Sequence, residues 1–393
     1  MAVADIPRLL REYIKASQAH GREPPAPSND VDIAATVERS RSLVRDLKPS
    51  EALSVLTARI AAENEAHARR LIPLLKEKAE VQRIVSDHTG RLAILEEIAR
   101  IDGSDAALWG EIGDIQILLG NSQDALGAYH RARSAAMADQ DERNISLSHE
   151  RIGDVLVAQG DGAEALAAYQ ASLALRTALA QRDPANTQWQ RDLSVSHSKI
   201  GDILVAQGDG AGALAAYQAS LALRTALSQR DPANTQWQRD LSVSHSKVGD
   251  VLVVQGDRAG ALAAYQAGLD IARSLAQRDP ANTEWQRDLS VSHNKIGDVL
   301  VAQGDGAGAL AAYQAGLDIA RGLAQRDPAN TQWQRDLVVS NVNLSEVVKT
   351  GKRAYLERAL QIVRDLYETN RLAPVDAWML DDLTRRLNDL PDE

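Results

Sequence analysis

Apolar residues along most of this chain recur with the period of an amphipathic helix. Residues 237–255 place Trp237 and Leu241 on one side of a helix, and residues 258–278 continue the pattern with Leu269. No segment shows the sustained alternation of apolar and polar residues that a half-buried strand would need. The pattern predicts an all-α fold.

Polar residues separate these helices at regular places. Pro232 ends one helix, and Asn234 or Thr235 can cap the exposed amides of the next. Gly256 is placed to end that helix in the left-handed conformation, and Asp257 to cap the one that follows. Each unit is therefore predicted to be two helices of roughly 20 residues, ~30 Å long at 1.5 Å per residue.

The helix pair recurs every 48 residues. The period is marked by three series of residues: Trp189, Trp237, Trp285 and Trp333; Gly153, Gly201, Gly249 and Gly297; Tyr169, Tyr217, Tyr265 and Tyr313. A fixed period in the range of about 20–50 residues is typical of stacked repeats, in which each unit contacts only its neighbours. Because the copies are nearly identical, they favour a repetitive surface over one active site.

The chain is expected to have five parts. Residues 1–21 hold an N-terminal helix, over about 4–19, and residues 22–30 are a Pro-rich linker. A helical region with a degenerate repeat follows at 31–103. About six helix pairs occupy 104–370, and 371–393 form a capping helix.

Within the N-terminal region the pattern predicts four helical segments. The first covers 31–47 and the second is a long stretch from 51 to 72. Pro73 then opens a helix that runs to Asp87, and His88-Thr89-Gly90 joins it to a helix over 91–101.

Composition narrows the class of protein. The chain has no Cys, which excludes disulfides, thiolate metal sites and a Cys nucleophile. Its start lacks a basic segment followed by an apolar run, and no stretch approaches the ~18 apolar residues of a membrane span. We expect a cytoplasmic protein that binds no membrane.

The charge distribution leaves two interpretations open. The net charge of −10 argues against nucleic acid as the main partner. Residues 111–190 carry half of it, with six basic and eleven acidic residues. This acidity either serves solubility or provides a docking surface for a basic partner.

Several registered motifs carry a resemblance to a known family. Trp109-x2-Ile112-Gly113 is followed by Ala125-x3-Tyr129. Four later units repeat this pattern without the Trp: an Ile or Val before Gly, followed by Ala-x3-Tyr. The chain resembles the tetratricopeptide repeat family over about 104–370. The resemblance implies a right-handed α-solenoid of antiparallel helix pairs, a superhelix whose first helices line the concave face.

Two departures from the family pattern matter. The usual unit has 34 residues, whereas these have 48, so both helices are about two turns longer. The family's Trp is replaced in each later unit by a histidine: His149, His197, His245 and His293. Similar lengthened repeats occur in bacterial proteins of signalling and defence, an association by fold alone.

Candidate chemistry gives no catalytic, cofactor or metal site. Each histidine lies in a different unit, roughly 10 Å from the next, whereas zinc needs several ligands at ~2 Å from one centre. Packed histidines are favoured. Ser196-His197 with Asp192 recurs in neighbouring units and lacks an oxyanion pocket, so it is not a triad. The Gly-rich turn at 208–212 lacks a phosphate-loop ending.

The aspartate after each repeated glycine is the best candidate for binding. The resemblance places these aspartates on the concave face, with a valine one turn later and a serine or asparagine one turn earlier. The candidate residues are Asp114, Asp154, Ser198, Asp202, Val205, Ser246, Asp250, Val253, Asn294, Asp298 and Val301. The basic residues Arg151, Lys199, Lys247 and Lys295 are expected to bridge to the aspartate of their own helix at i, i+3.

Together these observations predict a non-enzymatic scaffold that binds a protein or peptide, basic in one interpretation, along residues 109–310. An alternative function is a sensor or regulatory subunit of a bacterial signalling or defence effector, docking through residues 1–70. The near-identical units also allow a homo-oligomer. No cofactor is expected.

Overall fold

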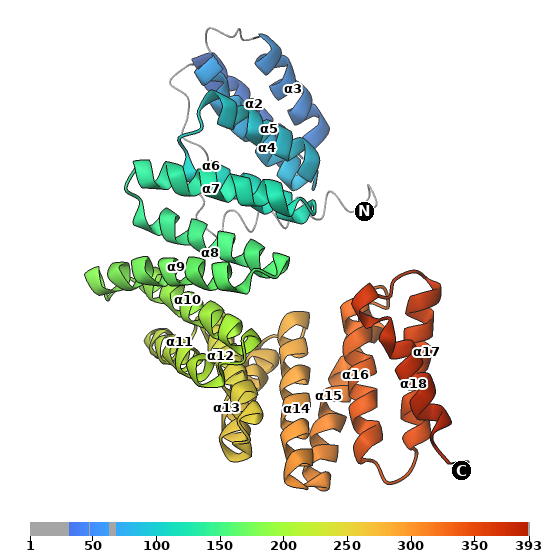
Figure 1. Ribbon diagram of the computed structural model, residues 1–393. Coiled ribbons are helices and arrows are strands. Elements are labelled where there is room, and N and C mark those ends of the chain that lie inside the picture. The colour runs from blue at the N-terminus through green and yellow to red at the C-terminus, as the bar shows by residue number, and fades with distance from the viewer. Residues whose placement is uncertain (1–30, 47, 63–67, 392–393) are drawn as a thin grey trace. The chain divides into compact units, whose positions relative to one another are not determined.

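The fold is described by a computed structural model for residues 31–46, 48–62 and 68–391 (Figure 1). The helix predicted over 4–19 and the linker predicted at 22–30 lie outside the described residues. The chain divides into two compact units, Met1–Arg182 and Asp183–Glu393, which are treated separately below. The boundaries predicted at 103/104 and 370/371 stay predictions.

Every regular element of the described residues is a helix, so the predicted all-α fold is confirmed. The described residues of the first unit form eight α-helices: α2 (Val31–Arg45), α3 (Pro49–Ala62), α4 (Ala68–Ile84), α5 (His88–Ile101), α6 (Ala106–Leu118), α7 (Ser122–Ala138), α8 (Glu142–Gln159) and α9 (Gly162–Arg182). None of the described helices has the length and apolar character needed to cross a bilayer.

The second unit is the more regular of the two. Its helices are α10 (Thr187–Ala206), α11 (Gly210–Arg230), α12 (Thr235–Val254), α13 (Arg258–Arg278), α14 (Thr283–Gln303), α15 (Gly306–Arg326), α16 (Thr331–Val347), α17 (Lys352–Glu368), the 3₁₀ turn η3 (Pro374–Asp376) and α18 (Trp378–Asn388). The first helices of successive pairs begin at Thr187, Thr235, Thr283 and Thr331, a constant interval of 48 residues.

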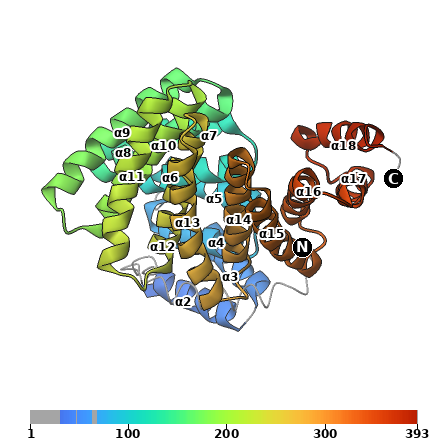
Figure 2. The same ribbon diagram turned by 90° about the horizontal axis from the view of Figure 1, so that it is seen from below.

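Within each unit, helices pack against those that precede and follow them in sequence (Figures 1 and 2). The most extensive contacts join the two helices of a pair, as in α10 with α11 and α12 with α13. Successive pairs then stack, as α11 does on α12 and α13 on α14. This arrangement is the predicted solenoid of helix pairs.

The interior of a pair is built on a tyrosine that lies against a glycine. In the pair α12–α13, Tyr265 and Ala261 are buried, and a Cβ on Gly249 would lie only 2.4 Å from Cε1 of Tyr265. Real Cβ atoms essentially never approach so closely, so the position must remain glycine. The same contact recurs at four other pairs: Gly113–Tyr129, Gly153–Tyr169, Gly201–Tyr217 and Gly297–Tyr313.

The predicted helix signals are confirmed. Asn234, rather than Thr235, caps α12, because its side chain accepts a hydrogen bond from the backbone N–H of Trp237 at 3.1 Å. Asp257 caps α13 by accepting from Gly260 N–H at 2.9 Å. Gly256 has φ +82°, the left-handed conformation expected at a helix end.

The N-terminal region departs from its predicted boundaries. The helix expected from 51 to 72 instead belongs to two helices, α3 and α4. Pro73 is the sixth residue of α4, so the helix lacks the one ladder bond that residue 73 would donate to the carbonyl of Arg69. His88, Thr89 and Gly90 form the first turn of α5, since Asp87 accepts a bond from Gly90 N–H at 2.8 Å.

The C-terminal end of the second unit has its own core. Leu356, Leu360 and Val363 of α17 pack with Val338 of α16 and with Met379 of α18. Within the predicted capping region 371–393, the structure has η3 and α18, and α18 packs on α17.

Candidate partner-binding face

The five candidate aspartates each accept a hydrogen bond from a tyrosine of the second helix in their pair. In every case the tyrosine lies 15 residues later: Tyr129 to Asp114 (2.9 Å), Tyr169 to Asp154 (2.5 Å), Tyr217 to Asp202 (2.5 Å), Tyr265 to Asp250 (2.6 Å) and Tyr313 to Asp298 (2.7 Å). Burial, together with the neighbouring carboxylate, raises the pKa of Tyr265 far above its ordinary value. The phenol therefore remains protonated and serves as a donor.

Lysines complete this arrangement, but not on their own helix as expected. Lys247 forms an ion pair with Asp202, and Lys295 forms one with Asp250, each reaching back 45 residues to the preceding pair. Lys247 Nζ also lies 5.3 Å from the centroid of the Tyr217 ring. The predicted i, i+3 bridge is therefore wrong for these two lysines, because the aspartate of the preceding pair takes the ammonium group.

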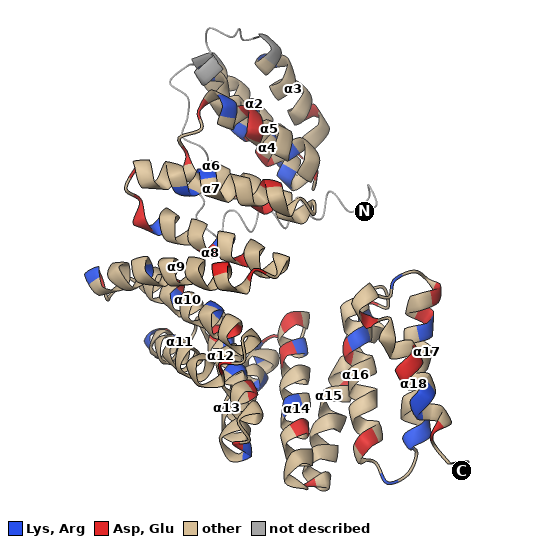
Figure 3. Ribbon diagram, viewed as in Figure 1, with Lys and Arg blue, Asp and Glu red and all other residues tan. Residues whose placement is uncertain are grey.

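In the first unit Arg151 has a similar place. Its guanidinium bonds to Asp114 at 2.6 Å, and its Cζ lies 5.7 Å from the centroid of the Tyr129 ring. A cation from the next pair thus compensates Asp114, as it does Asp202 and Asp250. The face is consequently less acidic than the aspartate series alone predicts, and Figure 3 shows both signs of charge along α14.

Asp298 is the exception in the second unit. The register that holds Lys247 and Lys295 continues 48 residues later at Asn343, which carries no charge. Asp298 is exposed, and the side-chain partner described for it is the hydroxyl of Tyr313. A basic group of a partner would therefore meet a carboxylate without a lysine from the following pair, although Lys295 of the same helix acts on it electrostatically. At Asp202 it would have to displace Lys247.

A row of exposed valines lies one turn after the aspartates. Val205, Val253 and Val301 of α10, α12 and α14 are 46%, 45% and 41% exposed. They occupy the same position in successive pairs of the second unit. The first unit carries Ile117 and Val157 in the equivalent position, both exposed, which the sequence analysis did not single out. We call Val205, Val253 and Val301, with Asp202, Asp250 and Asp298, the Val–Asp face.

The polar residues one turn before the aspartates do not share this exposure. Ser198 is buried, and its hydroxyl lies 2.8 Å from that of Ser220 in α11. Asn294 is directed toward α15, because a Cβ on Gly316 would lie 2.5 Å from its Oδ1. Ser246 is half-buried and donates to the carbonyl of Ser242 at 3.3 Å. Four residues rotate a helix about 40° beyond one turn, which carries this row toward the second helix.

The histidines behave as packed side chains in the described structure. His149, His197, His245 and His293 are half-buried, and burial is the main cause that lowers the pKa of each. No group of three or more His, Asp or Glu side chains in the described part of the chain is arranged to hold a metal ion.

A second ladder, absent from the sequence analysis, joins the pairs of the second unit. An arginine near the start of each first helix donates through Nε to an aspartate of the next pair: Arg191 to Asp240 (2.9 Å), Arg239 to Asp288 (2.5 Å), Arg287 to Asp336 (2.5 Å) and Arg335 to Asp376 (3.0 Å). We call each such contact an Arg–Asp joint. The recurring Arg-Asp dipeptide was its only signal in the sequence.

Comparisons with known proteins identify similar folds. No protein-family model matches the chain, and no curated protein matches it. The apo form of the quorum sensor NprR from B. thuringiensis is similar at 15% identity, with a TM-score of 0.57, over 97% of this chain and 99% of that one. The apo form of RapI is similar at 11% identity, also with a TM-score of 0.57, over 91% of this chain and 98% of that one.

A tetratricopeptide repeat protein from Parabacteroides merdae is also similar, at 12% identity and a TM-score of 0.45, over 78% of this chain and 98% of that one. In five helix pairs the glycine at the family's Gly position lies against the tyrosine that closes the Ala-x3-Tyr motif. The pairs also stack in chain order within each unit. The chain therefore has a tetratricopeptide-like fold of stacked helix pairs.

Proposed function

We propose that this chain is a non-enzymatic scaffold that binds a partner protein or peptide along the Val–Asp face. The observation that carries the proposal is the row of Val205, Val253 and Val301, three exposed apolar side chains at one position of successive pairs. Exposed apolar side chains that form a contiguous surface are typical of interaction sites.

The contacts of the aspartates indicate which side chains a partner would present to this face. Asp202 and Asp250 already bind lysines of the next pair, so they add little net charge to the face. The partner would therefore present apolar side chains to the valines. Its basic group, if it has one, would lie at Asp298, whose register lacks a lysine in the following pair. Affinity would be spread over several shallow contacts.

The test changes the valines rather than the aspartates. Substituting the aspartates would break tyrosine and lysine contacts inside the fold, and lost binding would then be ambiguous. The triple variant V205E/V253E/V301E should fold normally and reduce partner capture by more than about tenfold, since a fully buried valine contributes about 1.5 kcal/mol or more. Recovery from extracts of the source cells, quantified by mass spectrometry, measures this effect.

The matched control is Leu310→Glu, which changes an exposed apolar residue on the second helix α15. It should leave partner recovery unchanged. If the triple variant captured the same proteins in the same amounts as the wild type, the Val–Asp face would not be the binding surface.

A second candidate function is a sensor or regulatory subunit that docks on an effector through residues 1–70. It is favoured by the similarity in fold to a quorum sensor, which covers 97% of this chain. Deleting residues 1–70 would not test it, because Ile33 and Leu56 belong to the same core cluster as Leu74 and Leu95. Deleting residues 1–30 removes none of the residues described in that cluster. Undiminished effector binding by the shortened chain would contradict docking through the deleted residues.

A further inference from the structure

The last Arg–Asp joint lacks an aromatic residue that the preceding joints possess. In those joints a tryptophan lies three residues before the acceptor aspartate: Trp237 before Asp240, Trp285 before Asp288 and Trp333 before Asp336. At the last joint the acceptor is Asp376, which is buried, and the residue three places earlier is Ala373.

The tryptophan contributes to packing where it is present. Trp285 is half-buried against a core cluster that includes Leu269, Ala272 and Ala276 of α13. Trp285 thus adds its ring to a cluster formed mainly by α13 and α14. Because Ala373 has only a methyl group, the equivalent place at the last joint lacks that ring.

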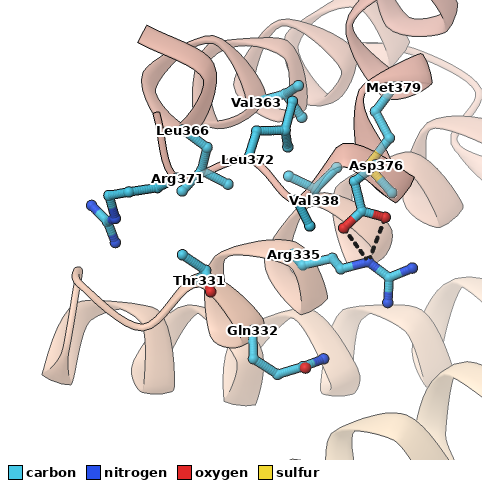
Figure 4. A pocket seen from close by; sticks show the side chains of 11 residues that line it. Thr331, Gln332, Arg335, Val338, Val363, Leu366, Arg371, Leu372, Asp376 and Met379 are labelled. Atoms are coloured by element: carbon cyan, nitrogen blue, oxygen red, sulfur yellow. Dashed lines mark hydrogen bonds and ion pairs between the residues drawn. The ribbon is translucent and has the colours of Figure 1, made fainter. Parts of the chain in front are cut away.

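A pocket is found at this place. Its volume is about 110 Å³, and Ala373 is among the residues that line it. Figure 4 shows Val338 of α16, Val363 and Leu366 of α17, and Met379 of α18 around it. The Arg335–Asp376 pair closes one side (Figure 4). The pocket therefore has apolar side chains on the α17 and α18 side, and polar ones elsewhere: the Arg335–Asp376 pair, Thr331, Gln332 and Arg371. Arg371 donates to the carbonyl of Pro328 at 3.0 Å.

The pocket is large enough for part of an aromatic ring system. An apolar cavity of about 150 Å³ is known to bind benzene, and indole is larger than benzene. The pocket here is smaller but open to the surface, so it would enclose an indole only in part, as Trp285 is only half-buried at its own joint. Two strongly exposed apolar residues, Val375 at 75% and Trp378 at 59%, flank Asp376 in the same segment. A polypeptide that placed a ring in the pocket would thus find further apolar surface close by in the chain.

We propose that this pocket, at the last Arg–Asp joint, binds a tryptophan side chain of a partner polypeptide. The partner's indole would take the place that the chain's own tryptophan holds in each preceding joint, so the contact continues the existing series of joints. This site lies on α16–α18 and is separate from the Val–Asp face. The proposal therefore does not depend on the function proposed above.

The experiment measures binding of N-acetyl-tryptophanamide to the full chain by saturation-transfer NMR, with free indole and N-acetyl-alaninamide as companion probes. We expect saturable binding of the first two probes and none of the third. Ala373→Trp should fill the pocket from within and weaken binding by at least about tenfold. The matched control Val254→Ala changes an exposed valine of α12 that does not line the pocket, and should bind as the wild type does.

A second variant keeps the test informative if Ala373→Trp does not place its ring as intended. Trp333→Ala should open an equivalent pocket at the preceding joint and add a second binding site for N-acetyl-tryptophanamide. The proposal is overturned if the wild type shows no saturable binding of that probe, or if Ala373→Trp and wild type bind it equally. Binding of free indole without binding of N-acetyl-tryptophanamide would also overturn it, since the pocket would then accept only a free small aromatic molecule.

Discussion

At the scale of single residues, the glycine of each Gly-Asp pair is required by the tyrosine ring that lies against it. A Cβ on Gly249 would lie 2.4 Å from Cε1 of Tyr265, and that ring is buried and bonded to Asp250. We expect Gly249→Ala to destabilise the second unit by about 1–3 kcal/mol, the usual effect of overpacking. The midpoint of urea unfolding, followed by circular dichroism, measures it.

Gly322 provides the control for that substitution. It lies inside α15, and an added Cβ would meet no atom within 4 Å. The register one unit earlier already holds Ser274. Gly322→Ala should therefore stabilise the helix by about 0.5–1 kcal/mol. Equal effects of the two substitutions would show that helix propensity, not the tyrosine contact, determines the stability of Gly249→Ala.

The histidine series predicts how stability depends on pH. Burial lowers the pKa of His197, His245 and His293 below the unfolded value of about 6.5, so the folded chain binds fewer protons than the unfolded one. Their contribution to stability is complete above pH ~6.5 and is lost as the pH falls below it. We expect the melting temperature to decrease between about pH 7.5 and pH 5.5, measured by differential scanning calorimetry.

Asn341 suggests the matched variant. It lies 48 residues after His293 and is buried in α16, so the fold accommodates an asparagine in this register. Changing His197, His245 and His293 together to Asn should flatten the pH dependence over this range. A wild-type melting temperature that did not change between these pH values would contradict the prediction.

At the scale of helices, one capping asparagine stabilises the start of each first helix in the second unit. Asn234 accepts a hydrogen bond from Trp237 N–H at 3.1 Å, and its ψ of 97° is the extended conformation usual for a cap. Asn234→Ala should destabilise the second unit by about 1 kcal/mol. The shift of the urea unfolding midpoint tests this value.

Thr235 is the control, because the sequence alone left either residue as the possible cap. Thr235 is the first residue of α12, and the capping bond comes from Asn234. Thr235→Ala should therefore change stability by less than about 0.5 kcal/mol. If the two substitutions had equal effects, the capping interaction would not be the reason for the asparagine.

Helix boundaries were predictable where the sequence repeats and less so elsewhere. The predicted second helix over 258–278 has the same limits as α13, since Asp257 and the following Asp-Pro signal recur in every copy. In the N-terminal region, Pro73 was taken as a helix start although it lies within α4. A proline occurs both at the start of a helix and, at the loss of one hydrogen bond, inside it. Its presence therefore did not determine the boundary.

At the scale of the whole chain, repetition made the fold class predictable, but contacts between pairs could not be predicted. The exposure of Val205 and Val253 agrees with their expected place on a binding face, although their role in binding stays a prediction. Ser198 was assigned to the same face but is buried. The reason is that a helical period specifies which residues share a side, not how far the second helix covers it.

The ion pairs show the same limit. Lys247 was expected to bond within its own helix, yet it bonds to Asp202, 45 residues earlier. Lys247 has two candidate partners, Asp250 on its own helix and Asp202 on the preceding pair. Only the stacking of one pair on the next determines which of them it bonds to. The Arg–Asp joints span 41 or 49 residues and depend on stacking in the same way.

The Arg–Asp joint has a direction along the chain. Each arginine donates to the following helix pair, and from Arg239 onward the aspartate next to it accepts from the arginine of the preceding pair. Removing residues 240–287 would place Arg239 next to Asp288, recreating the same dipeptide. Arg191 would then meet Asp288, and Arg239 would meet Asp336, so no joint would lose its partner. The joints are thus interchangeable. Genetic recombination between the near-identical copies can lengthen or shorten the protein by whole units, and every Arg–Asp joint keeps a partner.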